Sequence, residues 1–535
     1  MVPTINTSSS KPVDENLTSG KNLSFWFSSV DNPLSFETLE GEINTEVLVV
    51  GGGISGLTSA YCLAKKGLKV ILVEDGYLGS GETGRTTAHL TCALDDRYFE
   101  LEKTFDEATA QLAANSHMAA VEWIANTVER EKINCHFKRV DGYLFLHPSD
   151  KKETLEKEYA ATKRAGLQTE MLSTIPAISA EEGQWCIKFS DQGQFNIFLY
   201  IKGLANAFIE AGGKIYTKTK AENITEKGAT ANGFNISAKH IVVATNTPVN
   251  DMVTMHTKQW PYRTYAIAAK IKKGTLPYAL WWDTGDQDSH WISQPYHYVR
   301  LEEYDDQYDV LISGGEDHKT GQADEEHIKE EDRYTKLIEW TKKRFPSIES
   351  IEYQWSGQVM EPVDHLAYIG KNPGNDNVYI ITGDSGNGMT HGTLGGMIIT
   401  DIITGQENPL IKMYSPSRKT IKTSGDYLHE IGNMVKQYGD WLSEEALTET
   451  RQLQRGQGGV MSLGLKKVTV YRDDMDKLHT CSAICPHLGG ILQWNADEKT
   501  FDCPMHGSRF TPQGKVINGP AISDLKKISG MEEPA

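Results

Sequence analysis

Long apolar runs are missing from this sequence of 535 residues. No hydrophobic stretch reaches the length of about eighteen residues that a membrane-spanning helix requires. The first residues, MVPTINTSSSKPVDENLTSGKN, also lack the apolar core of a signal peptide, and we expect residues 1–43 to form an N-terminal arm. These absences predict a protein without a membrane span.

Cysteine is scarce, and its spacing is irregular. The chain has seven cysteines, an odd number, and four of them are scattered through its first part: Cys62, Cys92, Cys135 and Cys186. A disulfide framework needs paired, closely spaced cysteines, so a disulfide-rich extracellular protein is excluded and a cytoplasmic location is expected. A chain of this length can bury the cores of two or three domains without such cross-links.

Positive charge is in deficit. The sequence has 54 Lys and Arg against 72 Asp and Glu, which gives a net charge of -18. Because no basic stripe offsets this acidity, nucleic acid is not expected as a partner. The surplus modestly favours cationic small molecules as substrates.

Residues 46–75, EVLVVGGGISGLTSAYCLAKKGLKVILVED, have the pattern of a dinucleotide-binding unit. A β-branched run leads into Gly51, Gly53 and Gly56 at the G-x-G-x-x-G spacing, followed by a helix pattern and a second strand that ends at Glu74. The first glycine permits a tight turn, the second lets a pyrophosphate approach the backbone, and the third brings helix and strand together. We expect the phosphates at the helix N-terminus and the ribose hydroxyls at Glu74.

Other segments are expected at the same cofactor. The glycine- and threonine-rich stretch 76–95 is too polar for a core and too long for a simple turn. The strand HIVVATN at 240–246 and the late turn GDSGNGMTHGT, which opens a helix, both belong with the parallel sheet. The predicted cofactor-binding residues are Gly51, Gly53, Ile54, Ser55, Gly56, Glu74, Asp75, Arg85, Thr86, Thr87, Ala244, Thr245, Gly383, Gly386, Gly388, Met389 and Thr390.

The strand patterns divide the chain into domains. An α/β dinucleotide domain is expected in three pieces, at about 44–134, 195–255 and 356–415. Alternating, aromatic-rich strands at about 135–194 and 256–355 predict an antiparallel substrate-binding sheet inserted between them. Residues 416–454 are predicted to form a linker with an amphipathic helix at 426–447, and a small all-β domain is expected over 455–535.

A second chemical centre lies in that last domain, in TCSAICPHLGG and FDCPMHGSRF. Cys485 and His487 form C-x-H, and Cys503 and His506 form C-x-x-H. Two thiolates and two imidazoles from paired loops suit a [2Fe-2S] cluster in which the cysteines hold one iron and the histidines hold the other. Zinc is the alternative, although zinc fingers usually pair like ligands along the chain, whereas each loop here supplies one of each.

This stretch resembles the Rieske family over roughly residues 455–525, through CPHLGG and CPMHGSRF. The resemblance implies that the metal ligands are Cys485, His487, Cys503 and His506. Respiratory Rieske proteins carry an extra cysteine pair where this chain has Gly490 and Met505, and a tyrosine where it has Phe510, so we expect no loop disulfide. With fewer hydrogen bonds to stabilise the reduced cluster, the reduction potential is predicted in the lower half of the Rieske range of about -150 to +300 mV.

Residues 44 to about 410 resemble the D-amino-acid-oxidase and glycine-oxidase superfamily of FAD enzymes, through VVGGGISGL, VEDGYLGSGETGRTTAH, HIVVATN and IITGDSGNGMTHGT. The whole arrangement is similar to a bacterial group of such flavoproteins with a C-terminal Rieske domain. The resemblance implies FAD, which we expect to be non-covalent because His89 does not fit the spacing of a covalent attachment site. It also implies that Arg300 holds a substrate carboxylate, with Tyr298 and His391 as further catalytic candidates.

The two centres together predict an FAD-dependent dehydrogenase of an amine or (N-methyl) amino acid. Electrons would pass one at a time through the cluster to an acceptor protein or quinone, because a flavin takes two electrons and the cluster carries one. The alternative is a flavin/Rieske reductase or electron-transfer protein that feeds a partner enzyme. The chain contains only one complete G-x-G-x-x-G unit, which leaves no separate NAD(P)H domain for that role.

Overall fold

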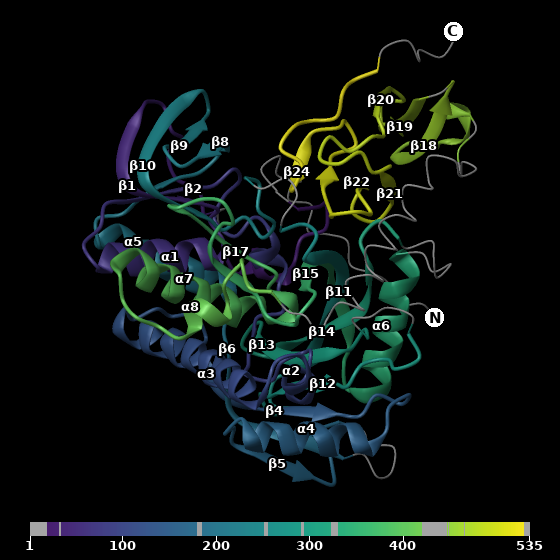
Figure 1. Cartoon of the computed structure of the whole chain (residues 1–535). Helices are drawn as coiled ribbons and strands as arrows, with labels where there is room; N and C mark the ends of the chain where they lie inside the picture. Colours follow the sequence, from purple (N-terminus) through teal and green to yellow (C-terminus); the bar gives the residue numbers. More distant parts are fainter. Residues whose placement is uncertain are drawn as a thin grey trace.

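The computed structural model describes residues 19–30, 34–178, 185–250, 255–289, 294–322, 330–419, 447, 449–464 and 466–528. Two large sheets form the main body, and a small β-domain lies at the C-terminal end of the chain (Figure 1). The helix expected at 426–447 falls outside the described residues except for Leu447. Among the described helices, none is long and apolar enough to cross a membrane.

The first sheet is the parallel sheet of the dinucleotide-binding unit. Its strands lie in the order β16-β17-β10-β1-β2-β7, and β8 and β9 form a hairpin beside β10. Val50 at the end of β1 is opposite Val73 of β2 and Val243 of β10, so the three parallel strands end at one edge. The strands are β1 (Ile43–Val50), β2 (Val70–Val73), β7 (Lys214–Tyr216), β8 (Ala221–Thr225), β9 (Gly228–Ala231), β10 (Phe234–Val243), β16 (Tyr368–Lys371) and β17 (Val378–Thr382).

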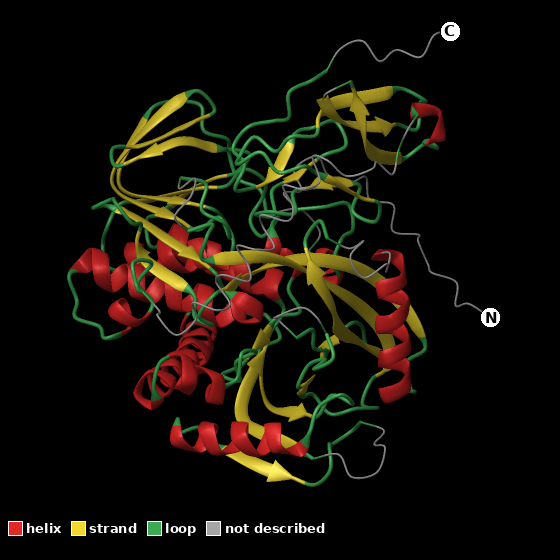
Figure 2. Ribbon diagram, turned by 45° about the vertical axis from the view of Figure 1, so that its right-hand side comes forward, coloured by secondary structure: helices red, strands yellow, loops and turns green. Residues whose placement is uncertain are grey.

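Helices pack beside this sheet, with α1 between α5 and α7 (Figures 1 and 2). The close packing of α1 on α7 depends on glycine, because a Cβ on Gly396 would lie 2.6 Å from the side chain of Thr58 and 2.7 Å from the backbone nitrogen of Ser59. The helices are α1 (Ile54–Lys65), α3 (Glu107–Arg130), α5 (Ile197–Glu210), α7 (Gly388–Thr404) and α8 (Leu410–Met413).

The second sheet has the order β15-β11-β14-β13-β12-β4-β6-β3, with β5 beside β6, and all of its pairs are antiparallel except β12 with β4. Besides strands from the two inserted stretches, it includes β3 and the end of β15. The strands are β3 (His89–Leu90), β4 (Lys138–Phe145), β5 (Thr169–Leu172), β6 (Cys186–Gln194), β11 (Gln259–Lys272), β12 (Leu280–Asp283), β13 (Tyr298–Glu303), β14 (Tyr308–Lys319) and β15 (Ser350–Pro362). Its helices are α2 (Tyr98–Thr104), α4 (Lys152–Arg164) and α6 (Glu330–Arg344).

The C-terminal domain contains two small antiparallel sheets, β18-β19-β20 and β21-β22-β23-β24. Its strands are β18 (Gln457–Leu463), β19 (Lys466–Arg472), β20 (Leu478–Ser482), β21 (Gln493–Asn495), β22 (Thr500–Asp502), β23 (Arg509–Phe510) and β24 (Val516–Asn518). Short 3-10 helices are η1 (Phe25–Ser29), η2 (Glu82–Arg85), η4 (Ser385–Asn387) and η6 (Thr450–Gln452). The predicted fold class, an α/β domain with an inserted sheet followed by a small all-β domain, is confirmed.

Candidate active site

The glycine turn after β1 is shaped for the close approach of a ligand to the backbone. Gly51 has φ +107°, and a Cβ there would lie 2.3 Å from the carbonyl oxygen of Ala244. A Cβ on Gly56 would lie 1.9 Å from the carbonyl oxygen of Gly51. The N-cap residue of α1 is Gly53, which has no side chain to cap the helix, so N–H groups of the first turn can bind phosphate oxygens.

Glu74 connects this turn to the end of β2. One carboxylate oxygen accepts the N–H of Gly52 at 2.6 Å, and the other accepts the N–H of Gly76 at 2.9 Å. Burial and the neighbouring carboxyl of Asp75 raise the pKa of Glu74 well above its usual value. The side chain thus holds the turn and also lines the cavity, where it is placed to meet ribose hydroxyls.

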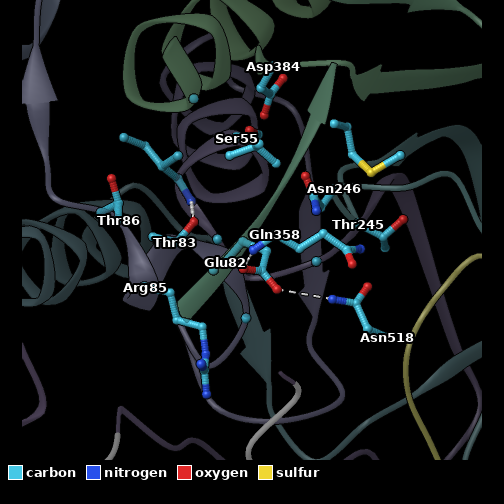
Figure 3. Close-up of a pocket in the computed structure, with 18 of the residues that line it drawn as sticks. Ser55, Glu82, Thr83, Arg85, Thr86, Thr245, Asn246, Gln358, Asp384 and Asn518 are labelled. Carbon is cyan, nitrogen blue, oxygen red and sulfur yellow. Dashed lines mark hydrogen bonds between the residues drawn. The ribbon is translucent and has the colours of Figure 1, made fainter. Parts of the chain in front are cut away.

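A cavity of about 300 Å³ extends between the glycine turn and the second sheet. Figure 3 shows Ser55 and Asp384 on one side of it and Asn518, from the C-terminal domain, on the other. The sequence-predicted residues that line it are Gly51, Gly53, Ile54, Ser55, Glu74, Asp75, Arg85, Thr86, Thr87, Ala244, Thr245, Tyr298, Gly386, Gly388 and Met389. Those placed outside its lining are Gly56, Arg300, Gly383, Thr390 and His391.

The guanidinium of Arg85 contacts the C-terminal domain. Its Nη1 lies 2.7 Å from Glu498 Oε1 and donates to the Ser356 carbonyl at 2.6 Å, while Nη2 donates to the Gly20 carbonyl at 2.7 Å. Both charged side chains of the pair are at most 2% exposed. Arg85 lines the cavity, and these donors connect it to the C-terminal domain; its contact with the cofactor stays a prediction.

Arg300 does not act as the expected carboxylate clamp. Its side chain is fully buried, forms an ion pair with Glu302, and donates to the backbone carbonyls of Ala88 at 2.9 Å and Phe195 at 3.0 Å. Tyr298 lies two residues earlier on β13 and lines the cavity. Arg300 lies further along the same strand, outside the cavity lining and beside Ala88. Its hydrogen-bonding capacity is used inside the protein, so we correct its assignment to a structural residue.

His391 also lies away from the cavity. Its Nδ1 is 2.9 Å from the carbonyl oxygen of Asp384, and its Nε2 is 3.2 Å from Nε2 of His117, whose other nitrogen is 2.8 Å from Thr390 Oγ1. Burial lowers the pKa of His391 to about 4, so the ring is neutral. This hydrogen-bonded pair packs α7 against α3, and the catalytic assignment of His391 is corrected to a packing role.

Three carboxyl groups that the sequence analysis did not select line the cavity together, and we call Asp95, Asp317 and Glu361 the acidic chamber. Burial raises the pKa of Asp95 and of Asp317 to about 7 each, and burial together with nearby acids raises that of Glu361 well above its usual value. Tyr296 and Tyr298 lie beside them, with ring centroids 5.3 Å apart. The only sequence signal was that Asp317 and Tyr298 lie in segments whose alternating residue pattern predicts strands.

His297 fixes the strands that carry these groups. Its Nδ1 is 3.0 Å from Asp283, and its Nε2 is 3.2 Å from Glu316, the residue before Asp317. Although burial alone would lower it, these carboxylates raise the pKa of His297 to about 9, so the ring is an imidazolium. His147 and Asp283 lie within ligand distance of His297, but with both ring nitrogens engaged by carboxylates we assign no metal there.

The two predicted ligand loops share one backbone pattern. Cys485 N–H donates to the Gly490 carbonyl at 2.9 Å and receives Gly489 N–H on its own carbonyl at 3.0 Å. In the second loop, Cys503 N–H donates to the Ser508 carbonyl at 2.8 Å, and its carbonyl receives Gly507 N–H at 3.0 Å. The matching turns present one cysteine and one histidine each, and the rings of His487 and His506 have centroids 4.9 Å apart.

These groups fit a [2Fe-2S] cluster. Neither ring nitrogen of His506 has a hydrogen-bond partner among the described residues, and burial lowers its pKa to about 3, so a neutral imidazole is ready to bind metal. The neighbouring Cys503 thiol lowers the pKa of Cys485. Gly490 and Met505 face one another, because a Cβ on Gly490 would lie 2.6 Å from Met505 Sδ. These are the two positions at which respiratory Rieske proteins have a disulfide, and here neither residue is a cysteine. The described cysteines are all free.

The ligand loops pack on the main body of the same chain. The ring of His256, from the loop before β11, lies 4.8 Å from that of His487 and 5.9 Å from that of His506, measured between centroids. Gln358 Nε2 donates to the Gly507 carbonyl at 3.2 Å. Gln322 Nε2 donates to the Pro504 carbonyl at 3.2 Å. The two histidine ligands thus face the domain that contains the cavity.

A dinucleotide fold with a long cavity, joined to a two-cysteine, two-histidine centre, defines a flavin- and iron–sulfur-dependent oxidoreductase. Residues 46–402 match the FAD dependent oxidoreductase family, and residues 443–529 match the Rieske [2Fe-2S] domain. The chain belongs to the FAD dependent oxidoreductase family and carries a C-terminal Rieske domain. Its cofactors are FAD and a [2Fe-2S] cluster, which favours the cluster over zinc at the C-terminal centre.

Known relatives agree with this assignment. The Bacillus subtilis Rieske 2Fe-2S iron-sulfur protein YhfW is 29% identical over 94% of this chain and 97% of its own length. The Escherichia coli gamma-glutamylputrescine oxidoreductase is 25% identical over 71% of this chain and 89% of its own. Glycine oxidase from Geobacillus kaustophilus has the same fold, with a TM-score of 0.57, 17% identity, and coverage of 70% of this chain and 99% of that one.

Proposed function

We propose that this protein oxidises the C–N bond of an amine with FAD and passes the electrons one at a time through the Rieske cluster to an external acceptor, either a protein or a quinone. The observation that carries the proposal is the position of the cluster ligands. His487 lies 4.8 Å, between ring centroids, from His256 of the FAD-binding part of the same chain. A cluster held there is close to the domain that receives the electrons from the substrate.

The cofactor would be held by groups already described. Gly51, Gly53 and the N-terminus of α1 would bind the pyrophosphate, and Glu74 would meet the ribose. FAD, when bound, supplies the acceptor for the hydride of the C–H bond beside the amine nitrogen. Both nitrogens of His89 contact protein atoms, Thr87 Oγ1 at 3.0 Å and the Val299 carbonyl at 3.2 Å, which supports non-covalent attachment.

The protein groups around the substrate would bind it and manage its proton. An amine binds as an ammonium ion and must lose one proton before its lone pair can form the C=N bond. A carboxyl with a pKa near 7, as burial gives Asp95 and Asp317, can accept that proton at neutral pH. Tyr298, whose hydroxyl lies 2.6 Å from Thr264 Oγ1, is placed to orient the substrate at the chamber wall.

The choice of an amine over an amino acid follows from the position of Arg300. Amino-acid oxidation needs a cation to hold the carboxylate, and the expected one is engaged by Glu302 and backbone carbonyls. The printed name of the Escherichia coli relative, gamma-glutamylputrescine oxidoreductase, also denotes a substrate derived from an amine. We therefore propose amines as the first substrates to test.

An anaerobic titration tests the proposed function. The purified protein is mixed with amines, amino acids, N-methylated amino acids, NADH and NADPH in separate experiments, and flavin absorbance and the cluster's EPR signal are followed together. The proposal predicts that an amine bleaches the flavin and that the reduced Rieske signal then grows. Reduction by a nicotinamide alone would overturn it in favour of a reductase that feeds a partner enzyme.

A further inference from the structure

The acidic chamber has carboxyl groups from three separate elements, and the cations that act on them, Arg97 and His297, contact other protein groups, including Asp283 and Glu316. Asp95 follows the polar stretch after η2, Asp317 lies near the end of β14, and Glu361 lies near the end of β15. In the described part of the chain, none of the three forms an ion pair with a basic side chain. The acids lie close enough to act on one another, since the charges of Asp95 and Asp317 both raise the pKa of Glu361.

Two of these groups, Asp317 and Asp95, each have one buried oxygen without a hydrogen-bond partner among the described residues. Asp317 is 9% exposed, lines the cavity, and its Oδ1 has no hydrogen-bond partner among the described residues. A buried carboxylate oxygen without a donor is costly, and native structures usually satisfy such atoms with protein, water or a ligand. A ligand that brings its own N–H donors would satisfy this oxygen.

Glu361 and Asp95 have hydroxyl groups beside them, and their carboxyl oxygens can still accept hydrogen bonds. Glu361 Oε2 accepts the hydroxyl of Ser385 at 2.7 Å. Asp95 lies against Gly386, where a Cβ would be 1.9 Å from its Oδ2 and 2.4 Å from the Tyr296 hydroxyl. Hydroxyl donors of this kind bring no positive charge, so these carboxyl groups remain available to a cationic ligand, which would favour their charged forms.

Basic residues in the cavity lining are engaged elsewhere. Arg85 forms its buried ion pair with Glu498, and Lys220 Nζ lies 3.3 Å from the Ile522 carbonyl. Burial lowers the pKa of His89 to about 3, so this lining histidine is neutral. Of the described lining residues, Arg85 is thus paired and His89 is neutral, so a substrate carboxylate in the chamber would lie beside three carboxyl groups.

We propose that the substrate is a diamine or polyamine, in which one nitrogen is oxidised while a second, cationic nitrogen is held by Asp317 and Glu361. This inference rests on the proposed function and specifies its substrate class. An ammonium group has three N–H donors and no acceptor, which matches a set of carboxylate oxygens that lack donors. The second charge separates such substrates from simple amines and from amino acids.

The reaction balances with the groups named. Asp95 takes one proton from the reacting ammonium, leaving a neutral amine, while Asp317 and Glu361 hold the distant ammonium. The C–H bond beside that nitrogen breaks, its electron pair leaves with the hydrogen as a hydride to FAD, and the nitrogen lone pair forms the C=N bond of a protonated imine. Water then adds to the imine and an ammonium ion leaves; the product is an aldehyde that still carries the distant ammonium, and the two leave the chamber together.

The test uses three probes of one chain length that differ at one end: 1,4-diaminobutane, 1-aminobutane and 4-aminobutanoate. Binding is measured anaerobically by calorimetry on the FAD-loaded full chain, and flavin bleaching is measured in parallel. We expect the diamine to bind at least about tenfold more tightly than the monoamine, and the aminobutanoate to bind least. Equal binding of all three, or tighter binding of the monoamine or the aminobutanoate, would overturn the proposal.

The variant Asp317→Asn examines the chamber itself. The amide has nearly the shape of the acid, so we expect the protein to fold and the preference for diamine over monoamine to shrink about tenfold or more. Asp376→Asn, at an exposed position, is the control and should leave the preference unchanged. A preference that persists in Asp317→Asn would contradict the assignment of Asp317.

The two proposals fail in different ways. If the diamine binds with the expected preference but bleaches no flavin, the cation-binding chamber stands and amine oxidation falls. If 1-aminobutane or 4-aminobutanoate bleaches the flavin faster than the diamine does, amine oxidation stands and the diamine class falls. Absence of both binding and bleaching with all three probes overturns the diamine proposal as well.

Discussion

Arg85 of the FAD-binding part and Glu498 of the Rieske domain form a buried ion pair with an N–O distance of 2.7 Å. The two residues lie 413 positions apart in the sequence, and each carries a side chain that is at most 2% exposed. Ser356 Oγ donates to the same carboxylate oxygen at 2.6 Å. The Rieske domain is thus fixed to the domain that contains the cavity by a contact from which water is excluded.

Removing one partner of this pair should loosen the domains. In Glu498→Ala the guanidinium of Arg85 stays buried without its counter-charge, and breaking a buried pair in this way costs about 3–5 kcal/mol. We expect a lower unfolding midpoint in urea. Asp376→Asn, which changes an exposed carboxyl, should unfold like the wild type; an unchanged midpoint in Glu498→Ala would contradict the role of the pair.

The same pair predicts an acid sensitivity. Burial alone would raise the pKa of Glu498, but Arg85, Arg509 and Arg263 lower it to about 2. A carboxyl with a depressed folded-state pKa contributes stability above its unfolded value of about 4.3, and this contribution is lost as the pH falls toward 2. The unfolding free energy of the wild type should therefore fall more steeply between pH 4 and pH 2 than that of Glu498→Gln. Parallel curves would contradict the prediction.

The Rieske domain should also support FAD binding. Asn518 and Ile522 line the cavity, and Asn518 Nδ2 donates to Glu82 Oε1 at 3.1 Å (Figure 3). Because a typical hydrogen bond contributes about 0.5–1.5 kcal/mol, Asn518→Ala should raise the dissociation constant of FAD about two- to tenfold. Equilibrium dialysis with flavin fluorescence measures this, with the exposed Asn126→Ala as control. An unchanged constant would show that this segment only covers the cavity.

Arg300 should matter for stability and not for substrate affinity. In Arg300→Met the buried carboxylate of Glu302 loses its arginine and keeps only the contact with His136, and we expect a loss of about 3–5 kcal/mol in unfolding free energy. The KM for the amine substrate should stay within about twofold in the fraction that remains folded. A KM raised more than tenfold with unchanged stability would restore Arg300 as a substrate clamp.

The sequence was most informative where function depends on local spacing. Gly51, Gly53, Gly56 and Glu74 lie within one βαβ unit, so their relation follows from the motif itself. The four cluster ligands were likewise predicted from the C-x-H and C-x-x-H spacing in two short loops. In both cases the residues that act together are neighbours in the chain or lie on adjacent turns.

Prediction failed where partners are distant in sequence. The alternation of β13 predicts which residues share a face, but it does not show that Arg300 reaches the carbonyl of Ala88 and the carboxylate of Glu302. The acidic chamber was missed because Asp95, Asp317 and Glu361 meet only after three remote segments fold together. Nothing local distinguishes these acids from the many exposed ones in a chain with 72 acidic residues.

The Rieske centre can be tested independently of the flavin. His506→Ala removes a predicted iron ligand, so the reduced-cluster EPR signal should be lost while FAD remains bound and is still bleached by the substrate. His479→Ala, in the same domain and 2.8 Å from Asp473, is the control and should retain the signal. In the wild type, redox titration should place the potential in the lower half of about -150 to +300 mV, because Phe510 and Met505 supply no hydrogen bond to the cluster. A value near the upper end would contradict this reasoning.

The most direct test of the account follows both centres in time after one addition of 1,4-diaminobutane without oxygen. Samples are frozen at intervals, and flavin absorbance and the Rieske EPR signal are compared at several protein concentrations. The account predicts that the flavin bleaches first and that the reduced-cluster signal then grows at a rate independent of protein concentration, as transfer within one chain requires. A cluster signal that appears only with NADH, or at a rate that rises in proportion to protein concentration, would contradict it.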